Sequence, residues 1–363
     1  MKEEVRLMKG NEAVAHAAIL YGCDGYFGYP ITPQSEVLET LEDLMPWETT
    51  GMVVLQAESE VAAINMVYGG AATGKAVMTS SSSPGISLKQ EGISYIAGSE
   101  LPALILNVMR GGPGLGTIQP SQADYFQATK GGGHGDYHLI VLSPSSVQEM
   151  VDFVGLGFDL SFKYRTPAMI LADGIVGQMM EKVVLPPQRP RRTDEEIRKQ
   201  CPWAVTGKKD GRKRNVITSL ELESARMEVI NQRLQATYRE IEKNETRWEE
   251  IEVEDADYLM VAFGSIARIC AKAMEIAKEK GIKVGILRPI TLWPFPKEAV
   301  EKAAQGKKGI LCVELNAGQM IEDVRLAVHD RLPVEHYGRL GGIIPSPQEI
   351  VDALEAKLIA ESK

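Results

Sequence analysis

Two short stretches near the start of the chain carry polar side chains at positions suited to chemistry. The first is Gly28-Tyr29-Pro30-Ile31-Thr32-Pro33-Gln34, and the second is Gln56-Ala57-Glu58-Ser59-Glu60-Val61. Each follows a short apolar run, at residues 25–29 and 52–55, that predicts a buried parallel strand. Because ligands of open α/β sheets bind beyond the carboxyl ends of the strands, both stretches are candidate binding loops.

Glu60 is the candidate catalytic group. It opens a helix predicted from Ser59 to Tyr68, and the residues that follow it are apolar or small. A carboxylate in the first turn can also serve simply as a favourable partner of the helix dipole. Glu58 lies only two residues earlier, so the local pattern leaves both the structural role of Glu60 and this rival open.

Three further polar residues occupy predicted loops. Thr32 lies between two prolines, which favours an extended or turn conformation. Its position after a predicted strand makes it a candidate ligand contact, and an ordinary turn is the alternative. Arg110 follows the apolar run 104–109, where an arginine can grip a substrate carboxylate with two hydrogen bonds or can be an ordinary surface residue. His134 lies in the glycine-rich segment 131–136, as a candidate acid, base or substrate contact or as part of a mobile loop.

The order of elements predicts an α/β protein with a doubly wound parallel sheet. From residue 186 to about residue 256 the chain becomes polar and charged, with no strong strand signal before Tyr258. We therefore expect one domain over residues 1–188, a charged linker over 189–256 and a second α/β domain over 257–363. Strands of the first domain are expected at 25–29, 52–55, 76–79, 104–109, 138–142 and 168–171.

The linker contains one long amphipathic pattern. Its apolar residues recur at helical spacing, which predicts a helix lying on its own chain or on a partner subunit. The stripe extends over only about three heptads, which disfavours a coiled-coil dimer. Its members are Leu220, Met227, Ile230, Leu234, Tyr238 and Ile241.

Composition excludes several classes of function. The chain is 44% hydrophobic and 25% charged, with a net charge of −9, which is typical of a globular protein that does not bind nucleic acid. Neither a leader sequence nor a long apolar segment is evident, so we expect a cytoplasmic protein without membrane contact. The four cysteines, Cys23, Cys201, Cys270 and Cys312, are too far apart to form a zinc or iron–sulfur motif, so no metal site is expected in this chain.

Five motifs, in order along nearly the whole chain, resemble the alpha subunit of 2-oxoacid:ferredoxin oxidoreductases. This resemblance implies that the first domain is the pyrimidine-binding domain of a thiamine diphosphate enzyme. It implies that the second is similar to the carboxy-terminal domain of transketolase. The motifs are Tyr29-Pro30-Ile31-Thr32-Pro33, Ser59-Glu60-Val61-Ala62-Ala63, Ser81-Ser82-Ser83-Pro84-Gly85, Arg110-Gly111-Gly112-Pro113 and Val313-Glu314-Leu315-Asn316-x-Gly318-Gln319.

The resemblance assigns roles to these residues. Glu60 would hydrogen-bond the aminopyrimidine ring of thiamine diphosphate and favour the tautomer that removes the thiazolium C2 proton. Thr32 would lie near the substrate carbonyl, and Arg110 would bind the substrate carboxylate. His134 stays a candidate substrate contact on the basis of its own loop. The other residues expected at the cofactor are Tyr29, Pro30, Ile31 and Ser83.

The resemblance also implies partner subunits. Asp24, Asp136 and Asp173 each adjoin a glycine, but none forms the Gly-Asp-Gly motif that holds magnesium and diphosphate in such enzymes. A beta subunit would supply the Mg²⁺ site, a ferredoxin-like delta subunit would carry [4Fe-4S] clusters, and a gamma subunit would complete the complex. The chain would be active only in that assembly, which would convert a 2-oxoacid and coenzyme A to acyl-CoA, CO₂ and reduced ferredoxin.

The choice of substrate depends on two loops. The glycine-rich loop after Arg110 and the segment 133–137 are most similar to the branched-chain members, which act on 2-oxoisovalerate. A 2-oxoglutarate enzyme is the alternative, although it would need a second cation for the distal carboxylate. A lipoamide-linked dehydrogenase and a non-catalytic scaffold with the same fold are further alternatives, and the presence of Glu60, Thr32 and Arg110 together disfavours the scaffold.

Overall fold

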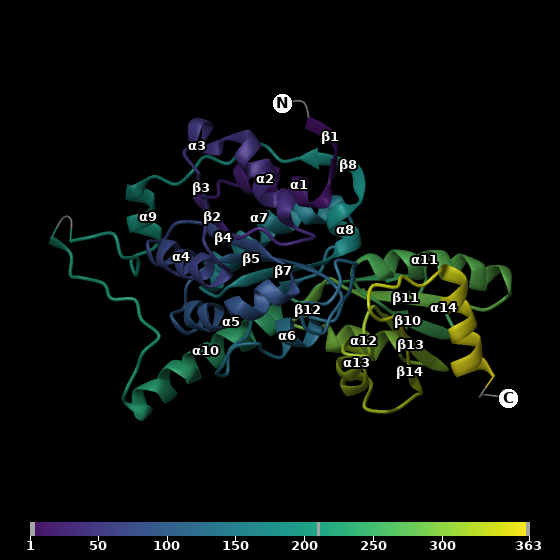
Figure 1. Ribbon diagram of the computed structural model, residues 1–363. Coiled ribbons are helices and arrows are strands. Elements are labelled where there is room, and N and C mark those ends of the chain that lie inside the picture. The colour runs from purple at the N-terminus through teal and green to yellow at the C-terminus, as the bar shows by residue number, and fades with distance from the viewer. Residues whose placement is uncertain (1–3, 209–210, 361–363) are drawn as a thin grey trace.

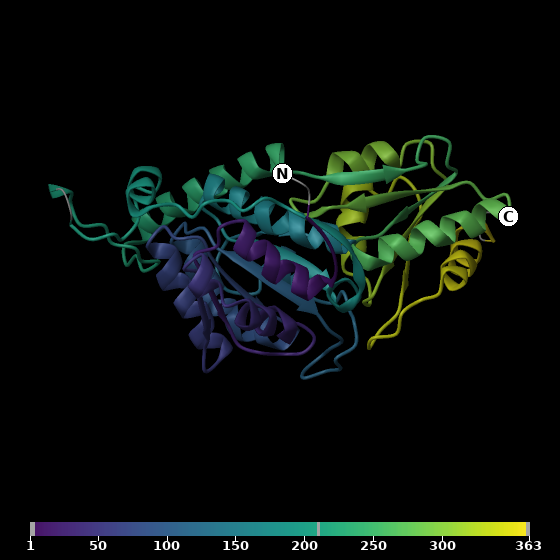
Figure 2. The same ribbon diagram turned by 90° about the horizontal axis from the view of Figure 1, so that it is seen from above.

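The computed structural model describes residues 4–208 and 211–360. Two α/β lobes lie side by side, a larger amino-terminal lobe and a smaller carboxyl-terminal lobe (Figure 1). The view from above shows the same arrangement, with the yellow carboxyl-terminal helices on the outer side of the smaller lobe (Figure 2). The predicted α/β class is therefore confirmed, and each lobe is organised around its own sheet.

The larger lobe contains a seven-stranded sheet in the order β12-β6-β7-β5-β4-β2-β3. Its strands are parallel except β12, which pairs antiparallel with β6. This arrangement confirms the predicted doubly wound parallel sheet. The strands are β2 (Gly25–Gly28), β3 (Val53–Gln56), β4 (Val77–Ser81), β5 (Leu104–Met109), β6 (Ile140–Leu142), β7 (Ala168–Asp173) and β12 (Thr291–Trp293).

Two groups of helices cover this sheet: α1 packs against α2 and α7, and α4 packs against α5. An antiparallel ribbon of β1 (Glu4–Lys9) and β8 (Met180–Leu185) runs beside them. The helices are α1 (Gly10–Leu20), α2 (Ser35–Leu44), α3 (Pro46–Thr49), α4 (Glu60–Ala72), α5 (Ser83–Gly98), α6 (Tyr125–Thr129), α7 (Val147–Tyr164), α8 (Gly174–Gln178), α9 (Asp194–Gln200) and α10 (Ser224–Asn244).

The smaller lobe is a second α/β unit with the strand order β14-β13-β10-β11-β9. Only β9 is antiparallel to its neighbour. The strands are β9 (Trp248–Ile251), β10 (Tyr258–Val261), β11 (Val284–Pro289), β13 (Gly309–Glu314) and β14 (Val334–Gly338). The helices are α11 (Gly264–Glu279), α12 (Lys297–Ala303), α13 (Met320–Val328) and α14 (Pro347–Leu354), followed by a π-helical turn, η2 (Glu355–Ile359).

Three local predictions were wrong. The run 52–55 was expected to be a buried strand, but β3 is the edge of the sheet and Val53 is 49% exposed. Strand β9 lies before Tyr258, where no strand was expected, because its charged sequence suits a sheet edge rather than a core. The amphipathic helix begins at Ser224, so Leu220 is outside it and 69% exposed.

The remaining apolar residues of the amphipathic helix include three that are buried, as predicted. Leu234, Tyr238 and Ile241 are buried against the larger lobe's hydrophobic core, so α10 lies on its own chain. The domain boundaries at residues 188 and 256 stay a prediction. The chain crosses between the lobes more than once, because β9 joins the smaller sheet and β12 returns to the larger one.

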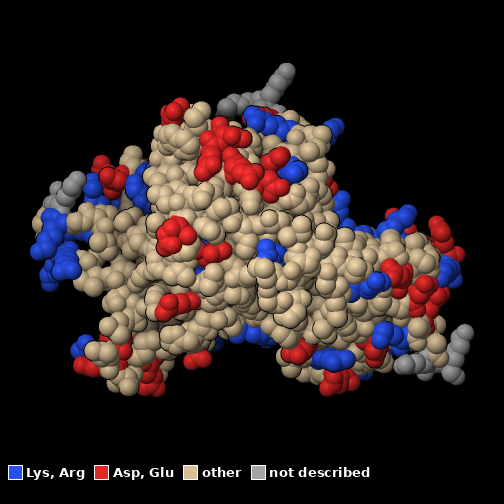
Figure 3. All heavy atoms as spheres, viewed as in Figure 1, with Lys and Arg blue, Asp and Glu red and all other residues tan. Residues whose placement is uncertain are grey.

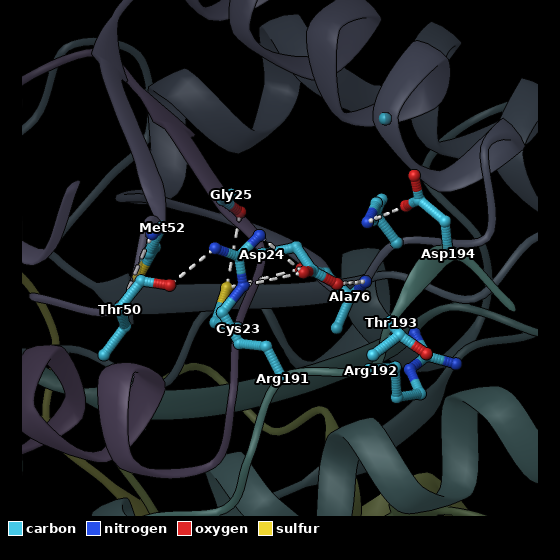
Figure 4. A network of polar contacts seen from close by, with 12 residues as sticks. Cys23, Asp24, Gly25, Thr50, Met52, Ala76, Arg191, Arg192, Thr193 and Asp194 are labelled. Atoms are coloured by element: carbon cyan, nitrogen blue, oxygen red, sulfur yellow. Dashed lines mark hydrogen bonds and ion pairs between the residues drawn. The ribbon is translucent and has the colours of Figure 1, made fainter. Parts of the chain in front are cut away.

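The segment after β8 is fixed to the sheet by a partly buried ion pair between Arg191 and Asp24 (Figure 4). Arg191 donates hydrogen bonds of 2.9 and 2.8 Å to Asp24 Oδ1 and one of 2.7 Å to the Thr50 carbonyl oxygen. Asp24 Oδ2 accepts a 2.8 Å hydrogen bond from the Ala76 amide. These contacts lie where β2 and β4 begin, at the edge of the sheet opposite to their carboxyl ends.

Candidate active site

Glu60 is the first residue of α4, directly after the loop that leaves β3. The Ser59 side chain accepts a 3.2 Å hydrogen bond from the Ala62 amide and so caps the helix. This cap turns Glu60 inward, where it is only 7% exposed, whereas Glu58 is exposed and accepts a hydrogen bond from the Ser59 hydroxyl. Of the two glutamates that the sequence left open, Glu60 is therefore the buried one and Glu58 the exposed one.

The Glu60 carboxylate accepts no hydrogen bond from any residue within 4–208 and 211–360, although it is nearly buried. The hydroxyl groups of Ser81 and Ser82, at the end of β4, are also buried without a partner in that part of the chain. A Cβ atom on Gly85 would lie 2.2 Å from Ser81 Oγ and 2.8 Å from Glu60 Oε1, so only glycine allows this close approach. Buried polar groups normally find partners, so this cluster is suited to a ligand.

Lys89 lies in the same region and was not singled out from the sequence. Its Nζ atom donates hydrogen bonds to Thr79 Oγ1 at 2.7 Å and to the Ser80 carbonyl oxygen at 3.4 Å. Burial lowers the pKa of Lys89 to about 7, and the negative charge of Glu60 opposes that shift. The only sequence signal was its position four residues after Gly85, which puts both on one helix face.

A chain of hydrogen bonds connects the strands to the loop 29–34. The hydroxyl groups of Tyr26 and Ser80 share a hydrogen bond of 2.6 Å, and the Ser80 hydroxyl donates to the Gln34 side chain. The Gln34 amide in turn donates to the Tyr29 carbonyl oxygen at 3.4 Å. These contacts hold the loop containing Pro30, Ile31 and Thr32 at the carboxyl ends of β2 and β4.

Arg110 connects the loop that contains Thr32 with the glycine-rich loop that follows Arg110 itself. It is 6% exposed, which excludes the alternative of a surface arginine. Its Nη1 donates to the Thr32 carbonyl oxygen at 2.9 Å and its Nη2 to the Leu115 carbonyl oxygen at 2.8 Å. Its buried Nε atom has no partner within the described chain. The structure thus brings Arg110 to the backbone of Thr32. Thr32 itself is exposed at the surface of its loop.

Ser83 fixes the position of Arg110 from the start of α5. The Ser83 hydroxyl accepts a 3.1 Å hydrogen bond from the Arg110 amide and donates one of 2.6 Å to Asp124 Oδ2. Asn107 Nδ2 also donates to that carboxylate oxygen, at 2.9 Å. Burial raises the pKa of the Asp124 carboxyl group, although these two hydrogen bonds partly oppose the shift.

His134 is exposed, and no contact joins it to Glu60, Thr32 or Arg110 within the described chain. The adjoining Gly133 amide donates a 2.9 Å hydrogen bond to the Tyr137 hydroxyl, which holds this loop beside α5. The structure therefore places His134 on a neighbouring loop but does not bring it into the cluster around Glu60. Its predicted contact with the substrate stays a prediction.

Among residues 4–208 and 211–360, no three His, Cys, Asp or Glu side chains come together in a way that could hold a metal ion. The four cysteines are buried and unpaired. No helix in the part of the chain that the structure describes has the length and apolar character needed to cross a membrane.

Residues 16–254 match the family described as pyruvate flavodoxin/ferredoxin oxidoreductase, thiamine diphosphate-binding. Residues 256–350 match core domain II of pyruvate:ferredoxin oxidoreductase. The chain belongs to the 2-oxoacid:ferredoxin oxidoreductase family. The predicted family, and the prediction of an enzyme subunit with a thiamine diphosphate-binding domain, are therefore confirmed.

Two relatives show where the chain falls within this family. It is 50% identical to the ketoisovalerate oxidoreductase subunit VorB of Methanothermobacter marburgensis, over 95% of this chain and 96% of the relative. It is 36% identical to the 2-oxoglutarate synthase subunit KorA of Archaeoglobus fulgidus, over 98% of this chain and all of the relative (100%). The chain is thus more similar to the ketoisovalerate subunit than to the 2-oxoglutarate subunit.

Solved structures support the fold. A 2-oxoglutarate:ferredoxin oxidoreductase from Magnetococcus marinus, with 2-oxoglutarate, coenzyme A and succinyl-CoA bound, matches with a TM-score of 0.85 and 27% identity. This match covers 98% of this chain and 66% of that one. A split-gene transketolase matches over 97% of this chain and 98% of that one, with a TM-score of 0.59 and 12% identity, and so shares the fold alone.

Proposed function

We propose that this chain is the alpha-type subunit of a complex that oxidatively decarboxylates 2-oxoisovalerate. The products would be a branched acyl-CoA, CO₂ and reduced ferredoxin, with coenzyme A as the acyl acceptor. The substrate assignment is supported by the 50% identity to a ketoisovalerate oxidoreductase subunit, against 36% to a 2-oxoglutarate synthase subunit. A cytoplasmic location stays a prediction from the sequence.

The observation that carries this proposal is the unsatisfied carboxylate of Glu60. A nearly buried carboxylate with no donor in the described chain is suited to a ring nitrogen or amino group of a ligand. The buried hydroxyl groups of Ser81 and Ser82, which have no partner in the described chain, lie beside it where Gly85 lets α5 approach closely. These residues therefore suit the aminopyrimidine of thiamine diphosphate, which supplies the electron sink for decarboxylation when bound.

The chain's own residues would then have distinct tasks. Glu60 would hold a proton at the pyrimidine nitrogen and set the ring's tautomer. Arg110 would attract the 2-oxoacid carboxylate, using the guanidinium hydrogen atoms that the loop carbonyls do not engage. Thr32 would border the substrate, with Tyr29, Pro30, Ile31 and Ser83 around the cofactor, and His134 would reach the substrate only if its loop moved.

An exposed apolar surface supports a partner subunit beside Glu60. We name this the α4–α5 surface, and its members come from β3, α4 and α5. The face seen in Figure 3 has a broad uncharged area across the larger lobe, interrupted by a few acidic groups and a basic one. Large exposed apolar areas commonly mark protein interfaces. The residues are Val53, Leu55, Val61, Met66 and Leu88.

We assign the remaining parts of the reaction to other subunits. A beta subunit on the α4–α5 surface would hold Mg²⁺ and the diphosphate, while a ferredoxin-like delta subunit would carry the [4Fe-4S] clusters and pass electrons to ferredoxin. A gamma subunit would complete the assembly. The alternative substrate is 2-oxoglutarate, which is bound in the solved structure from Magnetococcus marinus.

The test is anaerobic purification of the chain with its native partners, followed by a panel of 2-oxoacids with coenzyme A and methyl viologen. We expect rapid viologen reduction with 2-oxoisovalerate and little with 2-oxoglutarate or pyruvate. A preference for 2-oxoglutarate would leave the mechanism in place and overturn the substrate assignment. Purification without partners, and no reduction with any acid, would contradict the proposal as a whole.

A further inference from the structure

A basic cavity lies at the amino ends of the strands of the larger sheet. Its volume is about 630 Å³, and its wall includes Gly22 and Ala76, which precede β2 and β4. Glu60 and Ser81 lie at the carboxyl edge of the same sheet, so the length of a strand separates them from the cavity. Among the described residues, four basic side chains and one acidic side chain line it, although the chain has a net charge of −9. Positive charge is thus concentrated at this cavity.

Three of the four basic side chains are arginines that lie over aromatic rings. Stacking of this kind holds the plane of the guanidinium group, while its in-plane N–H groups can still donate to an anion. The wall therefore offers positive charge and flat apolar faces together. The pairs are Arg165 over Trp203, Arg189 over Tyr21 and Arg192 over Phe162, with 4.7, 4.6 and 4.2 Å from the guanidinium carbon to the ring centroid.

Two of the four basic side chains already have carboxylate partners. Arg189 donates hydrogen bonds of 2.8 and 3.2 Å to the two carboxylate oxygens of Asp159, the acidic residue of the wall. Lys163 Nζ forms an ion pair with Glu245 Oε1 at 2.7 Å. The charges of these two residues are balanced within the chain, so neither calls for a ligand.

Arg165 and Arg192 lack such partners. Arg165 donates from Nε to the Glu100 carbonyl oxygen at 3.0 Å, and its two Nη atoms make no hydrogen bond within residues 4–208 and 211–360. Arg192 donates to the Gly74 carbonyl oxygen at 2.8 Å and to Cys201 Sγ at 3.8 Å. No ion pair joins either arginine to a carboxylate in the part of the chain that the structure describes. Two cations without anions beside them make the cavity suited to an anionic ligand.

Fastening the segment after β8 to the larger lobe is the alternative role for these arginines. Arg191 has that role, because it donates two hydrogen bonds to Asp24 (Figure 4). Packing holds the same segment: a Cβ atom on Gly74 would lie 2.8 Å from the Ile197 side chain, so the two elements are in close contact. The segment is therefore fixed without Arg165, whose free Nη atoms fastening does not explain.

We propose that this cavity binds a nucleoside phosphate, whose phosphate oxygens accept hydrogen bonds from Arg165 and Arg192 and whose base contacts the aromatic wall. Guanidinium groups offer paired N–H donors that match the geometry of phosphate oxygens. A cavity of about 630 Å³ has the size of sites that hold ligands of this kind. The site is additional to the proposed function and does not rest on it, since it lies at the other edge of the sheet from Glu60.

The first measurement is the binding of ADP to the assembled complex, followed by isothermal titration calorimetry and by the fluorescence of Trp203. We expect saturable binding that changes the emission of this tryptophan, because it lies in the cavity wall. A Trp203→Phe complex should retain the heat of binding and lose that change. ADP that binds without changing the emission of Trp203 would occupy another site, which would contradict the proposal.

Substitution of the two arginines tests the phosphate contact. Arg165→Gln and Arg192→Gln should each weaken ADP binding about tenfold, as for the loss of one charged hydrogen bond. Arg226→Gln is the matched control, because Arg226 is exposed and forms a surface ion pair with Glu223 outside the cavity. The control should bind ADP as tightly as the native complex does. Equal weakening in all three variants would indicate a general effect of charge and overturn the proposal.

Simpler ligands test the two halves of the nucleotide. Inorganic phosphate and adenosine should each bind at least about tenfold more weakly than ADP. Phosphate that binds as tightly as ADP would exclude a contact with the base, and adenosine that does so would exclude a role for the arginines. Coenzyme A also carries a nucleoside phosphate, and its KM should remain native in Arg165→Gln. A rise in that KM matching the loss of ADP binding would make the cavity the site of the acyl acceptor, which would contradict an additional site.

Thermal unfolding decides the question if a substitution weakens the fold. A ligand that binds only the folded protein raises the thermal midpoint, by about 3 °C when ADP is present at about a hundred times its Kd. Arg165→Gln should lose this ADP-dependent rise whatever its own midpoint is. A lower midpoint in Arg165→Gln, combined with no ADP-dependent rise in the native complex, would mean that the arginine only fastens the chain and would refute the proposal.

Discussion

Each lobe buries a glutamate at the junction between a parallel strand and a helix. The two carboxylates differ in whether the chain supplies hydrogen-bond donors to them. Glu314, at the end of β13, is 0% exposed and accepts hydrogen bonds from Asn316 Nδ2 at 3.0 Å and from the Met320 and Ile321 amides at 2.8 and 3.1 Å. Glu60, at the start of α4, accepts none within the described chain. The two residues are buried to nearly the same extent, and they differ in the number of hydrogen-bond donors that contact the carboxylate.

This difference distinguishes a glutamate that the fold itself satisfies from one that we propose to bind a ligand. Glu314 satisfies the free amides at the start of α13, and Asn316 extends this contact by donating to the Gln122 carbonyl oxygen at 2.8 Å in the larger lobe. Its partners are all supplied by the chain, so no ligand is needed. For Glu60 the partners must come from elsewhere, and a full account of hydrogen bonds therefore indicates the site more clearly than burial does.

The largest effect is expected from Glu60→Gln, with Glu58→Gln as its matched control. Loss of a general acid–base group should reduce 2-oxoacid-dependent viologen reduction by about a thousandfold. The Glu58 variant should keep the native rate, because that side chain is exposed and outside the cluster. Equal losses of viologen reduction in the two variants would contradict a specific role for Glu60.

Glu314→Ala should chiefly affect stability. It leaves the Met320 and Ile321 amides and the Asn316 side chain without their acceptor, so the free energy of unfolding should fall by about 3 kcal/mol. Urea denaturation measures this loss, and Glu322→Ala, on the exposed side of the first turn of α13, is the control. Turnover per folded complex should remain native, and a loss comparable to that of Glu60→Gln would contradict the comparison.

Arg110→Lys should give a smaller, substrate-specific effect. A lysine keeps the charge but cannot hold the Thr32 and Leu115 carbonyl oxygens together while offering a second donor to a carboxylate. We expect KM for the 2-oxoacid to rise about tenfold, as for the loss of one charged hydrogen bond. An unchanged KM with reduced thermal stability would mean that Arg110 only ties the two loops together.

The smallest effect concerns pH. Burial raises the pKa of Glu314 above its usual 4.5, so the folded chain binds its proton more readily than the unfolded chain does. That stabilising contribution is fully present below pH 4.5 and is lost as pH rises through the folded-state pKa. The stability of the native protein relative to Glu314→Gln should therefore decrease from acid towards neutral pH in urea titrations, and a flat difference would contradict it.

Elements with an uninterrupted apolar run were predicted well from the sequence. The expected strand 104–109 coincides with β5, because a run buried on both faces leaves little choice of boundaries. The edge strands were less predictable. The sequence of β3 is as apolar as a central strand, and that of β9 carries two glutamates, so neither pattern reveals its neighbours in the sheet.

The same limit applies to the site. Glu60 is recognisable as a candidate because a polar residue at a strand-to-helix junction is visible in the sequence. Lys89 could not, since a lysine in the sequence Ser-Leu-Lys-Gln-Glu is typical of an exposed helix face. Its burial depends on the packing of α4 against α5, and that packing is a property of the folded chain rather than of any local pattern.

Dividing the gene between the two lobes would separate β12 from the sheet that it completes. Strand β12 belongs to the sequence of the second half but completes the edge of the first sheet, where Thr291 pairs with Leu142. A first half produced alone would expose the free backbone of β6, and open strand edges recruit further copies into aggregates. Separate halves should therefore remain soluble only when they are synthesised together, so that one fragment complements the other.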